Sequence, residues 1–136
     1  MTDSVNHMRL RFDKAEVMED GEAGCRVRVT VSYAARVIEA EAAMDDAPIG
    51  YLKAAAAATL KAVEGTVERR FTATLADLDH VNALGKDLVA VLVDIVFEGK
   101  NIQVFGSCPI AGPEIDAAVK AALNATNRFV ELSMRD

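Results

Sequence analysis

The sequence predicts an α+β protein, a two-layer sandwich built from two copies of a strand–strand–strand–helix (βββα) unit. First, the chain compares well with itself at a spacing of about 63 residues, so that the unit at about 8–67 recurs at about 70–132. Second, each unit begins with alternating apolar residues and closes with an apolar stripe at helical spacing. We therefore expect a single domain over 1–136, with a mostly antiparallel sheet and two helices on one face.

The repeat keeps its register through both strands and helix. In the helical segments, apolar residues match in pairs 63 positions apart, such as Leu52 with Ile115. In the second strands, matching valines lie 62 positions apart, such as Val27 with Val89. The spacing changes only at the loops, where insertions are tolerated, so the match indicates two equivalent units.

The first strand of each unit is expected at about 8–18 and about 70–82. It is the least regular element, because the stretch from Ala76 to Asn82 lacks a clean alternation of apolar and polar residues. Turn residues follow each strand, Asp20-Gly21 in the first unit and Leu84-Gly85 in the second.

The second strands, at about 25–33 and about 87–97, differ on one face. In the first unit, the residues between the valines are polar and predict a solvated face: Arg26, Arg28, Thr30 and Ser32. In the second unit, the equivalent residues are mostly apolar: Leu88, Ala90, Leu92 and Asp94. The second strand of the second unit is therefore apolar on both faces for most of its length.

The helices cover only one face of a sheet, so the other face of strand 87–97 needs a second cover. We expect that cover to be another copy of the chain, which gives a homodimer that pairs through Leu88, Ala90 and Leu92. The alternative is that loops of the first unit, or curvature of the sheet, cover these side chains within one chain.

Short turns at Ala34-Ala35 and Glu98-Gly99 lead to third strands at about 36–43 and about 101–106. A loop that contains proline then opens each helix.

The helices are expected at about 48–65 and about 113–131. Pro113 suits a first helical turn, where its missing N–H costs nothing. Glu114 and Asp116 favour the positive end of the helix dipole, and Gly65 is well placed to end the first helix.

Composition excludes several classes of function. The net charge of −6 disfavours nonspecific binding to nucleic acid or to anionic membranes. The longest apolar runs are far shorter than the roughly 18–20 residues of a membrane span, and the first residues lack the apolar core of a signal peptide. We expect a cytoplasmic protein without nucleic-acid or membrane partners.

Metal and cofactor sites have no sequence signature in this chain. Cys25 and Cys108 are expected as reduced thiols, and His7 and His80 lie far apart. No Cys-x-x-Cys or His-x-x-x-His spacing and no glycine-rich nucleotide loop is present. We expect neither a metal nor another cofactor.

Ser107 and Cys108 are the candidate site residues at the corner before the last helix. A catalytic serine or cysteine needs a general base within hydrogen-bond reach, and His80 is the one histidine of the same unit. The spacing of a Gly-x-Ser-x-Gly nucleophile elbow is absent. We therefore expect Ser107 and Cys108 to contact a ligand, with catalysis by these residues or His80 as the alternative.

Asn127 and Arg128 are further candidates near the end of the second helix. They suit a helix C-terminal cap, an interface or a ligand site.

The duplicated unit, whose last helix contains "NATNR", resembles the C-terminal regulatory domain of 2-isopropylmalate synthase. The residues that carry the resemblance are Gly106, Ser107, Asp116 and the stretch from Ala121 to Asn127. In the first unit Pro48 fits the family pattern, whereas Ala47 stands where glycine is usual.

The resemblance covers about 8–132 and implies a free-standing regulatory or assembly module whose domains pair across a twofold axis. The catalytic barrel of the synthase is missing, and the glycines that bind leucine in the family are largely absent, so the resemblance does not imply feedback by leucine.

Together these observations predict a non-catalytic module that binds a small metabolite or a protein partner as a homo-oligomer. A small cytosolic enzyme with a pocket between helices and sheet is one alternative, and a structural scaffold protein is the other.

Overall fold

The structure is a computed structural model that describes residues 10–18, 25–44 and 49–134. Two βββα units follow one another within these residues, as the sequence predicts. The first unit consists of β1 (Arg11–Met18), β2 (Cys25–Tyr33), β3 (Arg36–Met44) and α2 (Gly50–Thr66). The second consists of β4 (Phe71–Ala83), β5 (Lys86–Phe97), β6 (Lys100–Pro109) and α3 (Glu114–Met134).

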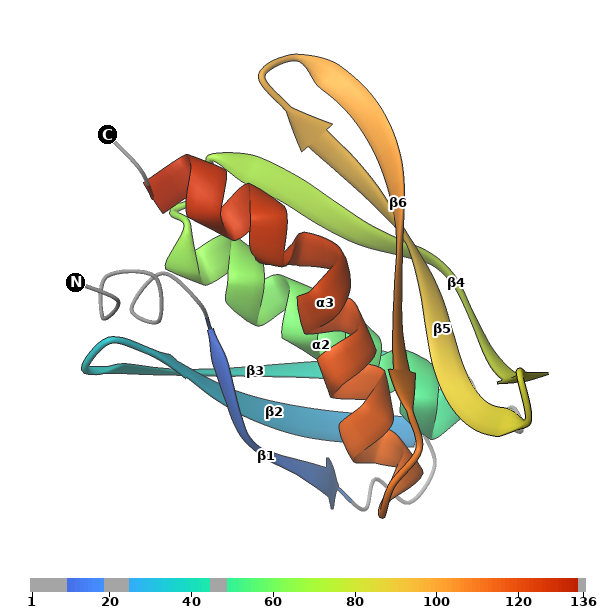
Figure 1. Ribbon diagram of the computed structural model, residues 1–136. Coiled ribbons are helices and arrows are strands. Elements are labelled where there is room, and N and C mark those ends of the chain that lie inside the picture. The colour runs from blue at the N-terminus through green and yellow to red at the C-terminus, as the bar shows by residue number, and fades with distance from the viewer. Residues whose placement is uncertain (1–9, 19–24, 45–48, 135–136) are drawn as a thin grey trace, which may run out of the picture.

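The strands form two antiparallel three-stranded sheets, β1-β2-β3 and β4-β5-β6, and each sheet is followed by its helix. The α+β fold with helices packed on antiparallel sheets is thereby confirmed. The expectation of one sheet with both helices on one face is wrong, because the two sheets are not hydrogen-bonded to each other. Figure 1 shows α2 and α3 side by side, with the first sheet running beneath the pair and the second rising beside it.

The alanine-rich helix α2 explains why two sheets are needed. Ala54, Ala55, Ala56 and Ala58 are all fully buried, and consecutive residues point to different sides of a helix. A single sheet would cover only one side of α2. In the structure α2 packs against β2 and β3 of its own sheet, against β4 of the other sheet and against α3.

The irregular first strands of both units contain a bulge at the same place. Pairing of β1 with β2 skips Asp13, and pairing of β4 with β5 skips Ala76. These two residues are 63 positions apart, which is the period of the repeat. An extra residue in one strand shifts its inward and outward alternation, and this explains the pattern that the sequence alone shows only poorly over β4.

The predicted turns between β2 and β3, β4 and β5, and β5 and β6 are confirmed. Leu84 and Gly85 both have positive φ, 55° and 77°, as a tight two-residue hairpin turn requires. Glu98 and Gly99 also both have positive φ, 53° and 78°. The turn predicted at 20–21 lies outside the described residues.

Two elements extend further than the sequence predicts, and this moves candidate site residues. Strand β6 continues to Pro109, so Ser107 and Cys108 lie in a strand rather than in a corner loop. Helix α3 continues to Met134, so Asn127 and Arg128 lie inside the helix. Their predicted role as a C-terminal cap is therefore wrong. The apolar stripe continues to Phe129 and Val130, which are buried and keep the helix going.

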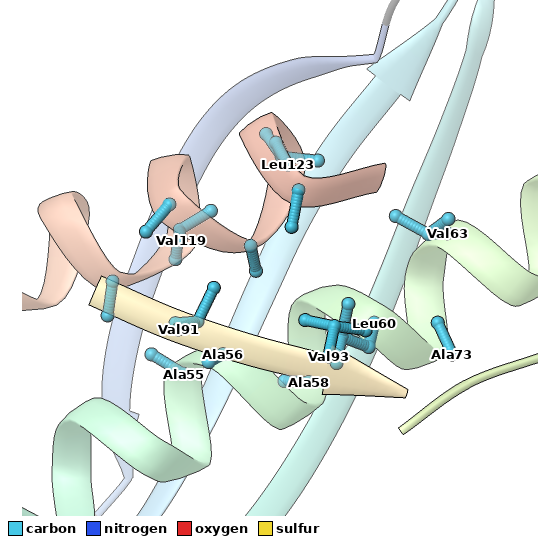
Figure 2. Close-up of a cluster of buried hydrophobic side chains, with 14 of the residues drawn as sticks. Ala55, Ala56, Ala58, Leu60, Val63, Ala73, Val91, Val93, Val119 and Leu123 are labelled. Atoms are coloured by element: carbon cyan, nitrogen blue, oxygen red, sulfur yellow. The ribbon is translucent and has the colours of Figure 1, made fainter. Parts of the chain in front are cut away.

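The core is built from small side chains at close spacing. Figure 2 shows Val91 and Val93 of β5 among alanines of α2 and together with Val119 and Leu123 of α3. At one end of the core, larger groups fill the space: the ring of Phe129 lies 6.0 Å and 5.7 Å from the ring centroids of two further phenylalanines, Phe71 and Phe97.

Gly106 allows β6 and α3 to approach very closely. A Cβ atom at this position would lie 2.7 Å from the Cβ of Ala125 and closer still to the carbonyl oxygen of Ala121. Real Cβ atoms do not approach other atoms this closely, so glycine is required for this contact. The contact also sets the position of Ser107, the next residue, against the same helix.

Candidate functional site

The outer faces of the two sheets differ in charge, as the sequence predicts, but Thr30, which was expected on the solvated face, is buried. On the first sheet, the guanidinium of Arg28 lies 3.0 Å from the carboxylate of Glu41 and 4.0 Å from that of Glu16. The hydrogen bond to Glu41 raises the pKa of Arg28, because it favours the charged guanidinium. Arg26 lies 3.8 Å from Glu41. This face is therefore a network of charges exposed to solvent.

The outer face of the second sheet is mostly apolar along β5 and β6 and acidic along β4. Leu88, Ala90 and Leu92 of β5 pair with Pro109, Ser107 and Phe105 of β6 on one side and with Val81, Asp79 and Asp77 of β4 on the other. The ring of Phe105 projects from this face and is 78% exposed. Next to it, a shallow groove of about 160 Å³ is lined by Ala90, Leu92 and two acidic residues of β4, Asp77 and Asp79, among others.

Three of the four predicted ligand residues meet in one pocket between the two units. The pocket has a volume of about 500 Å³ and lies where β1 of the first unit approaches β6 and α3 of the second. We call it the seam pocket, and its lining residues are Leu10, Arg11, Phe12, Ser107, Cys108, Pro109, Lys120, Leu123, Asn124 and Asn127. The fourth predicted residue, Arg128, is exposed on α3 and does not line it.

The polar residues of the seam pocket come from one face of α3. Lys120, Asn124 and Asn127 are four and seven positions apart, and Leu123 lies between them on the same face. Asn124 is engaged within the protein, because its Oδ1 accepts a hydrogen bond from the backbone N–H of Ser107 at 3.3 Å. Asn127 is different: its Oδ1 is buried and has no hydrogen-bond partner within the described residues.

The seam pocket also contains a cation held against an aromatic ring. The Nζ atom of Lys120 lies 6.0 Å from the ring centroid of Phe12. The contact joins α3 to β1, so the two units meet across the pocket through side chains.

The described residues do not bring a general base to Ser107 or Cys108. In the sheet, His80 pairs with Val89 and Val89 pairs with Cys108, which places His80 and Cys108 two strand spacings, about 10 Å, apart. The Nδ1 atom of His80 lies 3.0 Å from Glu114 and its Nε2 lies 3.9 Å from Asp87.

Ser107 and Cys108, the two candidate nucleophiles, lie on opposite faces of the sheet. The thiol of Cys108 donates a hydrogen bond to the backbone carbonyl of Pro109 at 3.4 Å. Cys108 and His80 lie in the row that includes Val89, on the inner face of the sheet. Ser107 pairs with Ala90 and lies on the outer face. Ser107, Cys108 and His80 therefore do not form a nucleophile-and-base pair in this arrangement.

Histidine, cysteine and carboxylate groups do not gather into a cluster of three or more that would hold a metal ion anywhere in the described part of the chain. Neither described helix is long and apolar enough to cross a membrane.

The chain matches no protein-family model and no curated protein. The resemblance to the regulatory domain of 2-isopropylmalate synthase is therefore supported by the duplicated βββα architecture alone. Membership of that family stays a prediction.

The sequence did not mark seven lining residues of the seam pocket as ligand residues: Leu10, Arg11, Phe12, Pro109, Lys120, Leu123 and Asn124. The three from α3 carry a signal, because they extend the face of Asn127 by two turns at helical spacing. Leu10 and the two residues of β1 carry none, because no local pattern indicates which strand of the first unit lies beside α3.

Proposed function

We propose that the chain is a non-catalytic binding module that acts as a homodimer and holds a small metabolite in the seam pocket. The observation that carries this proposal is the pocket itself. Its volume of about 500 Å³ falls within the range of about 300–1,000 Å³ of small-molecule sites. It combines apolar walls with a few polar groups, which is the composition such sites usually have.

The position of the pocket suits a regulatory role. A ligand there would contact both repeats, because β1 belongs to the first unit and β6 and α3 belong to the second. Ligand binding would therefore stabilise one arrangement of the two units over others.

The homodimer is proposed to form through the outer face of the second sheet. The first unit serves as a comparison within the same chain: Arg26, Arg28 and Thr30 stand where the second unit has Leu88, Ala90 and Leu92. The charge network of the first sheet has thus no counterpart on the second. An apolar face that remains open in the monomer favours association.

A second copy is the occupant that this face fits, because the face carries both a projection and a recess. The exposed ring of Phe105 forms one wall of a groove that is also lined by Ala90, Leu92, Asp77 and Asp79, among others. Two copies related by a twofold axis would each insert a ring into the groove of the other, which makes the contact self-complementary. Ser107 pairs with Ala90 and also lines the seam pocket, so dimer and ligand would share one strand.

Native mass spectrometry tests both parts of the proposal in one spectrum. We expect a dimer, with additional mass when a metabolite is retained. Leu92→Glu should convert the dimer to monomer or aggregate, because dimerisation would bury an unpaired charge. The matched control is Val37→Glu on the outer face of the first sheet, where the side chain is 67% exposed and the dimer should persist. A wild-type monomer, or a Leu92→Glu variant that remains a soluble dimer, would rule out this interface.

A further inference from the structure

We infer that the seam pocket binds a small organic anion, such as a carboxylate with a short hydrocarbon portion. This inference rests on the proposed function, since it names the ligand class of the same pocket.

The charge of the seam pocket is the first argument. Its lining contains two cations, Arg11 and Lys120, and no carboxylate. The chain as a whole has 21 acidic and 15 basic residues, so a pocket whose charged lining residues are all cations is not expected from the composition. Three other pockets in the described residues each include at least one carboxylate, from Asp77, Asp94 or Glu114.

These two cations have no carboxylate partner in the described part of the chain. Within the described residues, neither Arg11 nor Lys120 forms an ion pair, whereas Arg28 on the first sheet has two carboxylate partners. The recorded contact of Lys120 is with the ring of Phe12. Cations that line a pocket without a carboxylate partner favour an anionic ligand, because a charge-assisted hydrogen bond is stronger than a neutral one.

The polar groups of α3 add less to this argument. The Oδ1 atom of Asn127 is buried and has no hydrogen-bond partner within the described residues. Because this oxygen is closed to solvent, a molecule in the seam pocket does not reach it, and the charge of the pocket sets the ligand class.

The apolar walls limit the rest of the ligand. Leu10 and Leu123 are each 6% exposed and line the pocket together with Phe12. A short hydrocarbon portion would therefore lie against these side chains, with the anionic group towards Lys120 and Arg11.

The test compares an anion with a neutral molecule of the same shape. The probes are 3-hydroxybutyrate and 3-hydroxybutyramide, titrated into protein whose leucine methyl groups carry carbon-13. We expect 3-hydroxybutyrate to shift the NMR signals of Leu10 and Leu123 and to leave Leu84 unchanged, because Leu84 lies fully exposed in a turn. The neutral amide should bind about tenfold more weakly, since it lacks the charge-assisted contact.

Two matched variants test whether the anion contacts Lys120. Lys120→Met keeps the length of the side chain and should weaken binding of the anion about tenfold, with no effect on the amide. Lys100→Met removes an exposed lysine at the far end of β6 and should change nothing. Inorganic phosphate is the third probe, and its binding in place of the carboxylate would show that the anion is a phosphate.

The outcomes separate the inference from the proposed function. If the amide binds as tightly as the anion, or if Lys120→Met has no effect, the anionic class is wrong while the pocket stands as a ligand site. If no probe shifts Leu10 or Leu123, both the ligand class and the small-molecule site are overturned.

Discussion

The contact at Gly106 allows a sharp prediction about the packing of β6 on α3. In Gly106→Ala, the added methyl group would lie 2.7 Å from the Cβ of Ala125, about 1 Å inside the usual separation of carbon atoms. The carbonyl oxygen of Ala121 is closer still, and neither obstacle is the end of a flexible side chain. Strand and helix must therefore move apart, and the neighbouring core contacts loosen.

Overpacking of this kind costs about 1–3 kcal/mol, and we expect the upper end because the obstacles are backbone and a Cβ atom. For a chain of 136 residues, about 3 kcal/mol corresponds to a fall in Tm of about 10 °C. Thermal unfolding followed by circular dichroism measures this directly.

Gly65 provides the matched control, because the chemical change is the same and the surroundings are different. It lies in α2, and a Cβ atom there would meet nothing within 4 Å. Gly65→Ala should raise the stability by about 0.5–1 kcal/mol, through higher helix propensity. A Gly106→Ala protein that unfolds within about 2 °C of the wild type would refute the close approach of β6 and α3.

Two further substitutions test the core and the pocket. Phe129→Ala removes the ring that contacts Phe71 and Phe97 and should lower the free energy of unfolding by about 3–5 kcal/mol; a urea titration that shows less than about 1 kcal/mol would contradict this packing. Asn127→Leu replaces a buried acceptor that has no partner within the described residues and should raise the stability by about 1 kcal/mol in the same urea titration. An Asn127→Leu protein that is less stable than the wild type would show that the oxygen already has a partner.

Much of the fold could be predicted from the sequence because its determinants are local. Alternating valines indicate β2 and β5, and Leu84-Gly85 and Glu98-Gly99 indicate the turns at which they were found. The duplication helped, because a pattern that is weak in one unit is supported by the other. The apolar outer side of β5 was also readable, because each residue of a strand lies on the opposite face from the next.

The candidate site could be predicted only in part. Ser107 and Cys108 were candidates from the corner before the last helix and Asn127 from near the end of that helix, and all three line one pocket. Arg128 was placed with them because it is adjacent in sequence, but adjacent residues on a helix point about 100° apart, and Arg128 is exposed away from the pocket.

Only the tertiary structure decided how the two units are combined. The sequence by itself determined that each unit is three strands and a helix, because hydrophobic period and turn chemistry are properties of neighbouring residues. It did not determine that the sheets stay separate, or that β1 lies beside β6 and α3 to form the seam pocket. The first depends on how the buried alanines of α2 are covered on several sides, and the second depends on contacts between β1 and α3. Both kinds of contact join residues that are distant in the chain and leave no periodic trace in it.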